Sequence, residues 1–409
     1  MQKLGSFGVG AALLCALAGF EPSGFVSAAG GPGLATGGPY RVLAPIQSGS
    51  LLLFPVVRAE SKPVGETPFI TLDEGFKTGE VEVTEAGRAA GLIRSRGNGQ
   101  ANRFRGDQVN TLVLVNRSKQ PLLLLAGEIV TGGKQDRIIA KDRIVPVDAD
   151  PIDLSVFCIE PGRWTGTTAS FGASANAPAK SFMVQPAVRK QAMAAQDQQQ
   201  VWNSVHGAIS RMEAVAAAAP AAPLTTESVQ VTPRDLGTTS YAGAMQSAAV
   251  SEKVDEAAAP AIGGREIDGR EQVLARLRDE HAVGVVVAVH GEIIWADLFA
   301  STDLFARYWT KLVRSYAAES LTESEEHAAP GISDAQRFLD APATGSETSE
   351  GDVGVYRYRD LKSDNTETFV LESLLPGTGY DVHISKMKLR GVARPVTRPL
   401  DEMPPQIYR

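Results

Sequence analysis

Short apolar segments separated by polar turns fill residues 111–159, and their spacing limits the possible folds more than any other feature of the sequence. The segments cover residues 111–115, 122–125, 137–140, 143–147 and 152–159. Several short strands at close spacing, with no long helical pattern between them, favour an antiparallel sandwich or barrel over a parallel sheet. The sequence therefore predicts a β-rich first half over about residues 45–164.

Helical and hairpin signals lie outside these segments. Thr71 and Glu74 have capping-box spacing, so a short helix is expected to start there and to end near Gly79. Two apolar runs within residues 283–298 are joined by His290 and Gly291, which is typical of a hairpin. A helix should follow from Ser301. The predicted class is α+β: an antiparallel β-sandwich-like half, then helices, then a closing β-hairpin plus helix that shares the same core.

Composition suggests how the chain is divided. The predicted parts are a signal peptide at 1–28, a main domain at 45–320 with a flexible excursion at about 165–265, an acidic linker at 322–350, and a small β-rich C-terminal extension at 351–409. The extension is too small for a confident core of its own, so we expect it to dock on the main domain.

The N-terminus has the pattern of a secretory signal. Lys3 precedes an apolar stretch at 9–20, and small residues at 26–28 offer a cleavage site. The stretch is too short for a stable membrane span. The sequence therefore predicts an exported protein, periplasmic or extracellular. Removal of the signal would leave Cys158 as the sole thiol, and its apolar neighbours predict burial over nucleophilic chemistry.

Charge and histidine spacing exclude some kinds of partner. The formal net charge is −7, with acidic and basic residues mixed along the chain. Binding of nucleic acid depends on lysines and arginines that neutralise phosphates, so no nucleic-acid partner is expected. The five histidines show no pair at metal-ligand spacing. Neither a metal nor another cofactor is predicted, and the expected partner is an anionic small molecule or another protein.

The first polar corner spans residues 127–137. It lacks the lysine and hydroxyl spacing of a phosphate-binding loop. Two interpretations remain open: a solvated glycine-rich turn, or a cleft that binds an anion through backbone N–H groups and basic side chains. The candidate residues are Gly127, Glu128, Gly132, Lys134, Gln135 and Arg137.

The second polar corner spans residues 158–164, where Pro161 and Gly162 fit a type II turn. Such a turn would bring Glu160 and Arg163 close together. Trp164 could then either pack on the protein or stack on a ligand. Asp297 is a further candidate, because an acid at the end of an apolar hairpin needs either solvent or a partner, and Arg163 or Lys134 could be that partner.

Several motifs resemble one known family in the same order along the chain. They are TLDEGFKTGEVEVTE, LLLLAGEIVTGGKQDR, VFCIEPGRW and VGVVVAVHGEIIWADLF followed by FARYWTKLVRSYA. Together, over about residues 45–320, they resemble the ARG and rhodanese-phosphatase-superfamily-associated protein domain. The resemblance implies a link to ADP-ribose or phosphoester metabolism by association, and no established reaction.

Two functional hypotheses follow. The preferred one is an exported ligand-binding or accessory module for an anionic small molecule, held by Lys134, Arg137 and Arg163. The alternative is a hydrolase of a phosphoester or glycosidic bond, with Glu128 or Glu160 as general base. No nucleophile–base pair is visible in the sequence, which favours binding and leaves enzymatic activity open. Both hypotheses require the two corners to face one cleft.

Overall fold

The computed structural model of the chain describes residues 40–58, 68–87, 110–162, 171–172, 182–218, 236–264, 267–321 and 327–389. The predicted signal peptide lies outside these residues.

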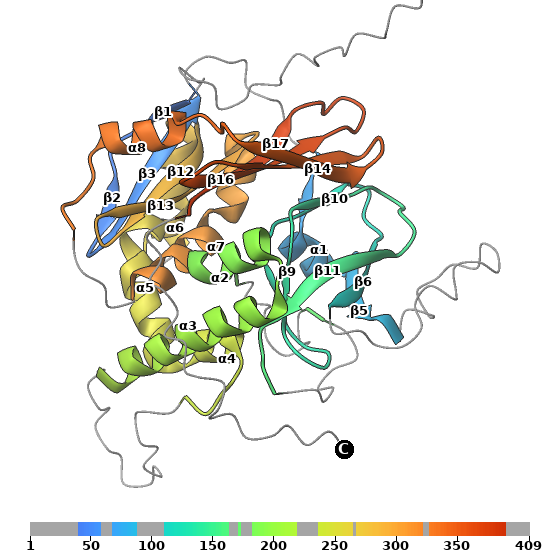
Figure 1. Ribbon diagram of the computed structural model, residues 1–409, viewed down its shortest axis with the longest axis horizontal. Helices are drawn as coiled ribbons and strands as arrows, with labels where there is room; N and C mark the ends of the chain where they lie inside the picture. Colours follow the sequence, from blue (N-terminus) through green and yellow to red (C-terminus); the bar gives the residue numbers. More distant parts are fainter. Residues whose placement is uncertain are drawn as a thin grey trace, which may run out of the picture.

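A nine-stranded antiparallel sheet contains both the first and the last strands of the described residues (Figure 1). Its spatial order is β1–β3–β12–β13–β17–β16–β15–β14, and β2 pairs with β3. The strands are β1 (Tyr40–Val42), β2 (Ile46–Ser48), β3 (Leu51–Arg58), β12 (Ala282–Val289), β13 (Glu292–Phe299), β14 (Ser346–Asp352), β15 (Tyr356–Lys362), β16 (Thr366–Ser373) and β17 (Asp381–Lys388).

Two smaller sheets lie beside the large one and carry the polar corners. The first has the order β5–β6–β11–β9–β8 and is antiparallel throughout, and the second has the order β10–β7–β4, with a parallel β4–β7 pair. Their strands are β4 (Ile70–Thr71), β5 (Val81–Glu85), β6 (Thr111–Asn116), β7 (Leu122–Leu124), β8 (Ile129–Val130), β9 (Arg137–Ile139), β10 (Arg143–Val145) and β11 (Ile152–Cys158).

Helices cover both faces of the large sheet unequally. Most of them gather on one face, and α8 lies against the other (Figure 1). They are α1 (Leu72–Thr78), α2 (Pro186–Lys190), the π-helix η2 (Gln191–Ala195), α3 (Gln198–Ala218), α4 (Tyr241–Gln246), α5 (Ala248–Ile262), α6 (Ile267–Asp279), α7 (Thr302–Ser320) and α8 (Ile332–Asp340).

The hairpin β12–β13 forms the centre of the large sheet, between β3 and β17. Val285 and Val287 belong to the core shared with α7, whereas Val286 and Ala288 belong to the core beneath α8. Burial of β12 on both faces explains why that strand is apolar along its whole length. The predicted hairpin and following helix are confirmed.

Local helix signals also act as predicted. The Thr71 side chain accepts a hydrogen bond from the Glu74 N–H, and the Glu74 carboxylate accepts one from the Thr71 N–H. Gly79 ends the helix in the left-handed conformation, with φ of 71°. Ser301 caps α7 in a similar way through the Leu304 N–H. These caps satisfy N–H groups that have no partner within the helix.

The α+β class is confirmed, but its halves are arranged differently from the prediction. The first strands, β1 to β3, do not join the other early strands in a sandwich, because β3 pairs with β12. The expected flexible excursion contains five helical elements, from α2 to α5. The expected linker contains α8 and most of β14. The expected extension supplies β15 to β17, and β17 pairs with β13 in the large sheet. Sheet pairing therefore makes the C-terminal strands part of the main body.

No helix within the described ranges is both long enough and apolar enough to cross a bilayer.

Candidate functional site

Glu128, a predicted general base, is completely buried in an ion pair. Its carboxylate accepts hydrogen bonds from the Leu125 N–H at 2.7 Å and from the Lys311 ammonium of α7 at 2.5 Å. Lys311 also lies 2.8 Å from Asp73. Burial lowers the pKa of Lys311, but the two carboxylates outweigh it and raise that pKa. Both oxygens of Glu128 are thus engaged by protein donors that fasten the first corner to α7.

The remainder of the first corner is organised around Glu85 of β5. The Glu85 carboxylate accepts a hydrogen bond from the Lys134 N–H at 2.9 Å and lies 3.9 Å from the Arg137 guanidinium. Arg137 is fully buried and donates to the Gln135 carbonyl at 2.8 Å. Gln135 is itself buried, while Lys134 and Gly132 are half-buried. The basic group expected to meet a ligand, Arg137, therefore points into the protein.

The two polar corners are neighbours in the five-stranded sheet, while the cleft that both hypotheses require between them stays a prediction. Strand β9 pairs with β11, so that Arg137 lies opposite Cys158. Beyond the paired strands, the Asp136 N–H donates to the Glu160 carboxylate at 3.2 Å. Cys158 is buried, and burial raises the pKa of its thiol to about 11. The predicted burial of Cys158 is confirmed, whereas Arg163 and Trp164 lie outside the described residues.

Asp297 is the centre of a buried network, and its basic partner among the described residues is Arg189 rather than Lys134. Its carboxylate lies 2.8 Å from the guanidinium of Arg189 in α2 and accepts hydrogen bonds from Ser385 at 2.5 Å and from Tyr316. The Arg189 guanidinium also stacks over Trp295, 4.8 Å from the ring centre. Of the two expected alternatives, Asp297 has a partner rather than solvent, but that partner comes from the segment expected to be a flexible excursion.

His383 of β17 extends this network to the small sheets. Its Nδ1 lies 2.6 Å from Asp142 and its Nε2 lies 3.2 Å from Asp297. The other oxygen of Asp142 accepts the Ala126 N–H at 2.7 Å. All three ionisable side chains are inaccessible to solvent. The network therefore ties the first corner, the helices and the large sheet together.

Gly127 lies beside this network rather than beside a ligand. It adopts a positive φ of 90°, and a Cβ atom there would lie 2.9 Å from the Arg189 Cγ. The absent side chain lets the Arg189 stem cross the corner and reach Asp297. The close approach that the sequence suggested for a ligand is used by a protein side chain.

The network predicts a pH-dependent stability. Burial alone lowers the pKa of His383, but Asp142 and Asp297 outweigh it and raise that pKa to about 8. Protonated His383 therefore stabilises the fold fully below the pKa of an unfolded histidine, about 6.5, and this contribution is lost as the pH rises through 8. The free energy of unfolding should fall by about 2 kcal/mol across this window. Urea unfolding at several pH values measures it.

Two variants separate His383 from other titrating groups. His383→Asn should remove this part of the pH dependence, in addition to lowering stability. His327→Asn, at a site with 53% of the side chain exposed, should leave it unchanged. Equal pH profiles for the wild-type protein and His383→Asn would exclude His383 as the cause.

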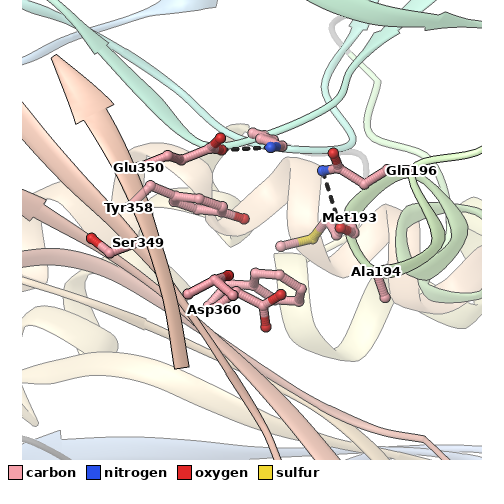
Figure 2. Close-up of a pocket in the computed structure, with 10 residues that line it drawn as sticks. Met193, Ala194, Gln196, Ser349, Glu350, Tyr358 and Asp360 are labelled. Carbon is pink, nitrogen blue, oxygen red and sulfur yellow. Dashed lines mark hydrogen bonds and ion pairs between the residues drawn. The ribbon is translucent and has the colours of Figure 1, made fainter. Parts of the chain in front are cut away.

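A cavity of about 270 Å³ lies between η2 and strands β14 to β16 (Figure 2). Tyr358 points from β15 toward Met193, with Glu350 and Asp360 on either side of it. Glu350 forms an ion pair with Lys141 at 2.5 Å. The lining residues are Lys141, Met193, Ala194, Gln196, Thr348, Ser349, Glu350, Tyr358, Asp360 and Phe369. π-Helices are rare and are often found at functional sites.

Two buried polar groups that line this cavity have no hydrogen-bond partner among the described residues. Tyr358 is 3% exposed, and its hydroxyl has no hydrogen-bond partner among the described residues. Burial and the nearby Asp142 carboxylate hold its pKa well above the usual value, so the hydroxyl stays protonated. One oxygen of Asp360 is also buried without a partner in the described part of the chain. The sequence analysis placed Tyr358 and Asp360 in a β-rich extension but proposed no functional role for either residue.

A second cavity of about 380 Å³ lies near the β12–β13 turn and is lined partly by Glu292, His327 and Lys388. Glu292 is within 3.8 Å of both His327 and Lys388. These charged groups already pair with one another at the surface. The first cavity is therefore the stronger candidate site. In the described part of the chain, no group of three histidine, cysteine or acidic side chains could hold a metal ion.

A comparison with family models gives one match. The family described as ARG and Rhodanese-Phosphatase-superfamily-associated Protein domain matches residues 39–387. The match includes β14 to β17 and thus the cavity. It confirms the resemblance seen in the sequence and extends it to the C-terminal strands. No match to a curated protein or to a solved structure was found.

Proposed function

Because the chain belongs to the ARG and Rhodanese-Phosphatase-superfamily-associated Protein domain family, which has no established activity, we propose a function from the geometry of the site. The protein is a ligand-binding module, and the cavity beside η2 takes a small, hydroxyl-rich molecule of about the size of a monosaccharide.

The unpartnered hydroxyl of Tyr358 carries this proposal. A buried polar group that lacks a hydrogen bond destabilises the folded protein by about 1–3 kcal/mol. Such groups in native proteins call for an explanation, and a missing ligand is one. Tyr358 lines the cavity and keeps its proton, so it would donate a hydrogen bond to a ligand oxygen.

The other lining groups favour a neutral polar ligand. Glu350 and Asp360 bring two carboxylates, while Lys141 brings one ammonium group that already pairs with Glu350. This balance does not favour the anion expected from the sequence. Phe369 and Met193 add apolar surface on which the carbon face of a sugar ring can rest. The volume is slightly below the range of about 300–1,000 Å³ usual for drug-sized ligands, which favours one sugar ring.

Calorimetric titration with D-ribose, D-glucose and ribose 5-phosphate tests the proposal. A neutral sugar should bind more tightly than the phosphorylated one. Tyr358→Phe should weaken binding by about tenfold at most, because a neutral hydrogen bond contributes about 0.5–1.5 kcal/mol. The same change should leave the protein as stable as the wild type or slightly more stable, since it removes an unpaired buried hydroxyl.

Tyr356→Phe is the matched control, since Tyr356 lies on the same strand and does not line the cavity. It should leave binding unchanged. Absence of binding by all three compounds would refute the proposal. A preference for ribose 5-phosphate would instead favour an anionic ligand, as the sequence analysis expected from Lys134, Arg137 and Arg163.

Export is a separate part of this proposal and rests on the N-terminal sequence pattern alone. A mature protein that begins near Ala29 would support it, and one that retains residues 1–28 would contradict it. Sequencing of the N-terminus decides between them.

A further inference from the structure

Two carboxyl groups lie together at the edge of the cavity. In the pairing of β15 with β16, Lys362 lies opposite Glu367 and Asp360 lies opposite Phe369, so Asp360 and Glu367 are diagonal neighbours on one face. Their carboxyl groups are close enough for each to affect the pKa of the other. One oxygen of each is buried and has no donor among the described residues. A single proton shared by the two groups would supply the missing donor.

The surroundings of this pair favour such a proton. Glu367 is 1% exposed, and burial raises the pKa of both Glu367 and Asp360. The charged groups that face the pair are Lys362 of β15, Glu350 of β14, Lys190 of α2 and Lys141 before β10. The Lys362 ammonium lies 3.6 Å from Glu367, and the Lys190 ammonium is bound to the carbonyls of Lys388 and Leu389. These cations do not cancel the effect of burial.

A second carboxylate faces the cavity from the neighbouring strand. In the pairing of β14 with β15, Thr348 lies opposite Asp360, and Glu350 lies two residues further along the same face. Diagonal neighbours of this kind are about 7–8 Å apart, with their Cβ atoms somewhat closer. Glu350 is 54% exposed and forms an ion pair with Lys141, so water can reach it. Its environment is therefore more exposed to water than that of Asp360, which is half-buried, and of Glu367, which is buried.

Two carboxyl groups with different environments suit acid and base catalysis at a sugar. In glycosidases that invert the anomeric centre, the acid and the base are about 6.5–9.5 Å apart, which leaves room for a water molecule. The unpartnered Tyr358 hydroxyl between them independently points to a bound oxygen-rich ligand.

We propose that, given the sugar binding proposed above, this cavity hydrolyses a glycosidic bond with inversion of configuration. Asp360 donates its proton to the leaving oxygen as the bond between that oxygen and the anomeric carbon breaks. Glu350 accepts a proton from water as the water oxygen bonds to the same carbon. Proton exchange with solvent restores both groups, so no cofactor is needed. Glu367 is a positioning residue that holds the proton on Asp360.

The test compares 4-nitrophenyl and methyl glycosides of ribose, glucose and galactose. Asp360→Asn should lower kcat/KM for a methyl glycoside by about 10²–10⁴-fold, because its leaving group needs a proton. The loss on the matching 4-nitrophenyl glycoside should be much smaller, since 4-nitrophenolate leaves without one. A merely structural role for Asp360 would lower both rates equally and would overturn the assignment.

Further variants test the other roles. Glu350→Gln should abolish turnover of both substrates but keep sugar binding, whereas Glu347→Gln, on the same exposed strand outside the cavity, should change neither. Glu367→Gln should move the alkaline limb of the kcat/KM profile to lower pH, because one carboxyl group then holds the proton without its partner. NMR of the first product should show the inverted anomer.

The two experiments distinguish a failure of the binding proposal from a failure of the hydrolysis proposal. If a sugar binds in calorimetry but none of the glycosides is hydrolysed, the hydrolytic inference is overturned and the binding function stands. If no sugar binds and no glycoside is hydrolysed, both are wrong. Turnover with a retained anomer would also overturn the assignment of Glu350 as a base that activates water.

Discussion

Arg189→Met is expected to lower the free energy of unfolding by about 3–5 kcal/mol, the usual effect of removing one partner from a buried ion pair. The change removes the closest counter-charge of the Asp297 carboxylate, which is inaccessible to solvent, and leaves only His383, 3.2 Å away and shared with Asp142, to balance it. Ser385 and Tyr316 would still donate hydrogen bonds to it, but neither carries a positive charge. Urea unfolding followed by circular dichroism measures the difference.

Arg117→Met is the matched control for this prediction. The Arg117–Glu82 pair has nearly the same separation, 2.7 Å against 2.8 Å, but its side chains are 40% and 33% exposed. Water screens such a pair, so the control should lose no more than about 1 kcal/mol. Similar losses in both variants would show that burial does not set the strength of the Arg189–Asp297 pair.

Gly127→Ala is expected to destabilise the protein by about 2–6 kcal/mol through two separate effects. The positive φ of 90° strains any residue with a side chain, by about 1–3 kcal/mol. The new methyl group would also meet the Arg189 stem at 2.9 Å, which forces a shift worth about 1–3 kcal/mol in a packed site. Thermal and urea unfolding measure the total.

Comparison of Gly127→Ala with Gly162→Ala isolates the second effect, the contact with Arg189. Gly162 has almost the same φ, 91°, but a Cβ atom there would meet no described residue within 4 Å. This variant should show the backbone strain alone and be the more stable of the two. If it is destabilised as much as Gly127→Ala, then contact with Arg189 is not the reason for a glycine at position 127.

Local structures that depend on a few neighbouring residues could be predicted from the sequence. The capping box at Thr71 and the turn at His290 and Gly291 each depend on neighbours within four positions. The β12–β13 hairpin was recognisable because its two apolar runs are close in the chain. These elements fold as predicted because their own residues supply the decisive contacts.

The sequence did not predict which strands pair when they are far apart along the chain. Nothing in β3 marks β12 as its neighbour, because an apolar strand can pair with many others. The same limit affected Asp297: the sequence showed that an acid there needs solvent or a partner, but Arg189 lies 108 positions away, in a segment without a clear apolar period. The buried Arg189–Asp297 ion pair was thus not predictable from local sequence patterns.

The cavity residues illustrate a further limit. Asp360 and Glu367 are ordinary acidic residues in their strands, and only the register of β15 against β16 brings their carboxyl groups together. Glu350 belongs to a strand that composition assigned to a linker, since β14 is almost entirely exposed. The chemistry proposed for this cavity depends on the register of the strands and not on a sequence motif.

The pairing of β3 with β12 also has a kinetic consequence. Strand β3 ends at Arg58, and β12 starts only at Ala282, so the middle of the large sheet cannot form until most of the chain has left the ribosome. Contacts between such distant segments close large loops and slow folding. Until then, the apolar β3 remains without its partner and is open to association with other chains. We therefore expect refolding of the whole domain to be slow and sensitive to protein concentration.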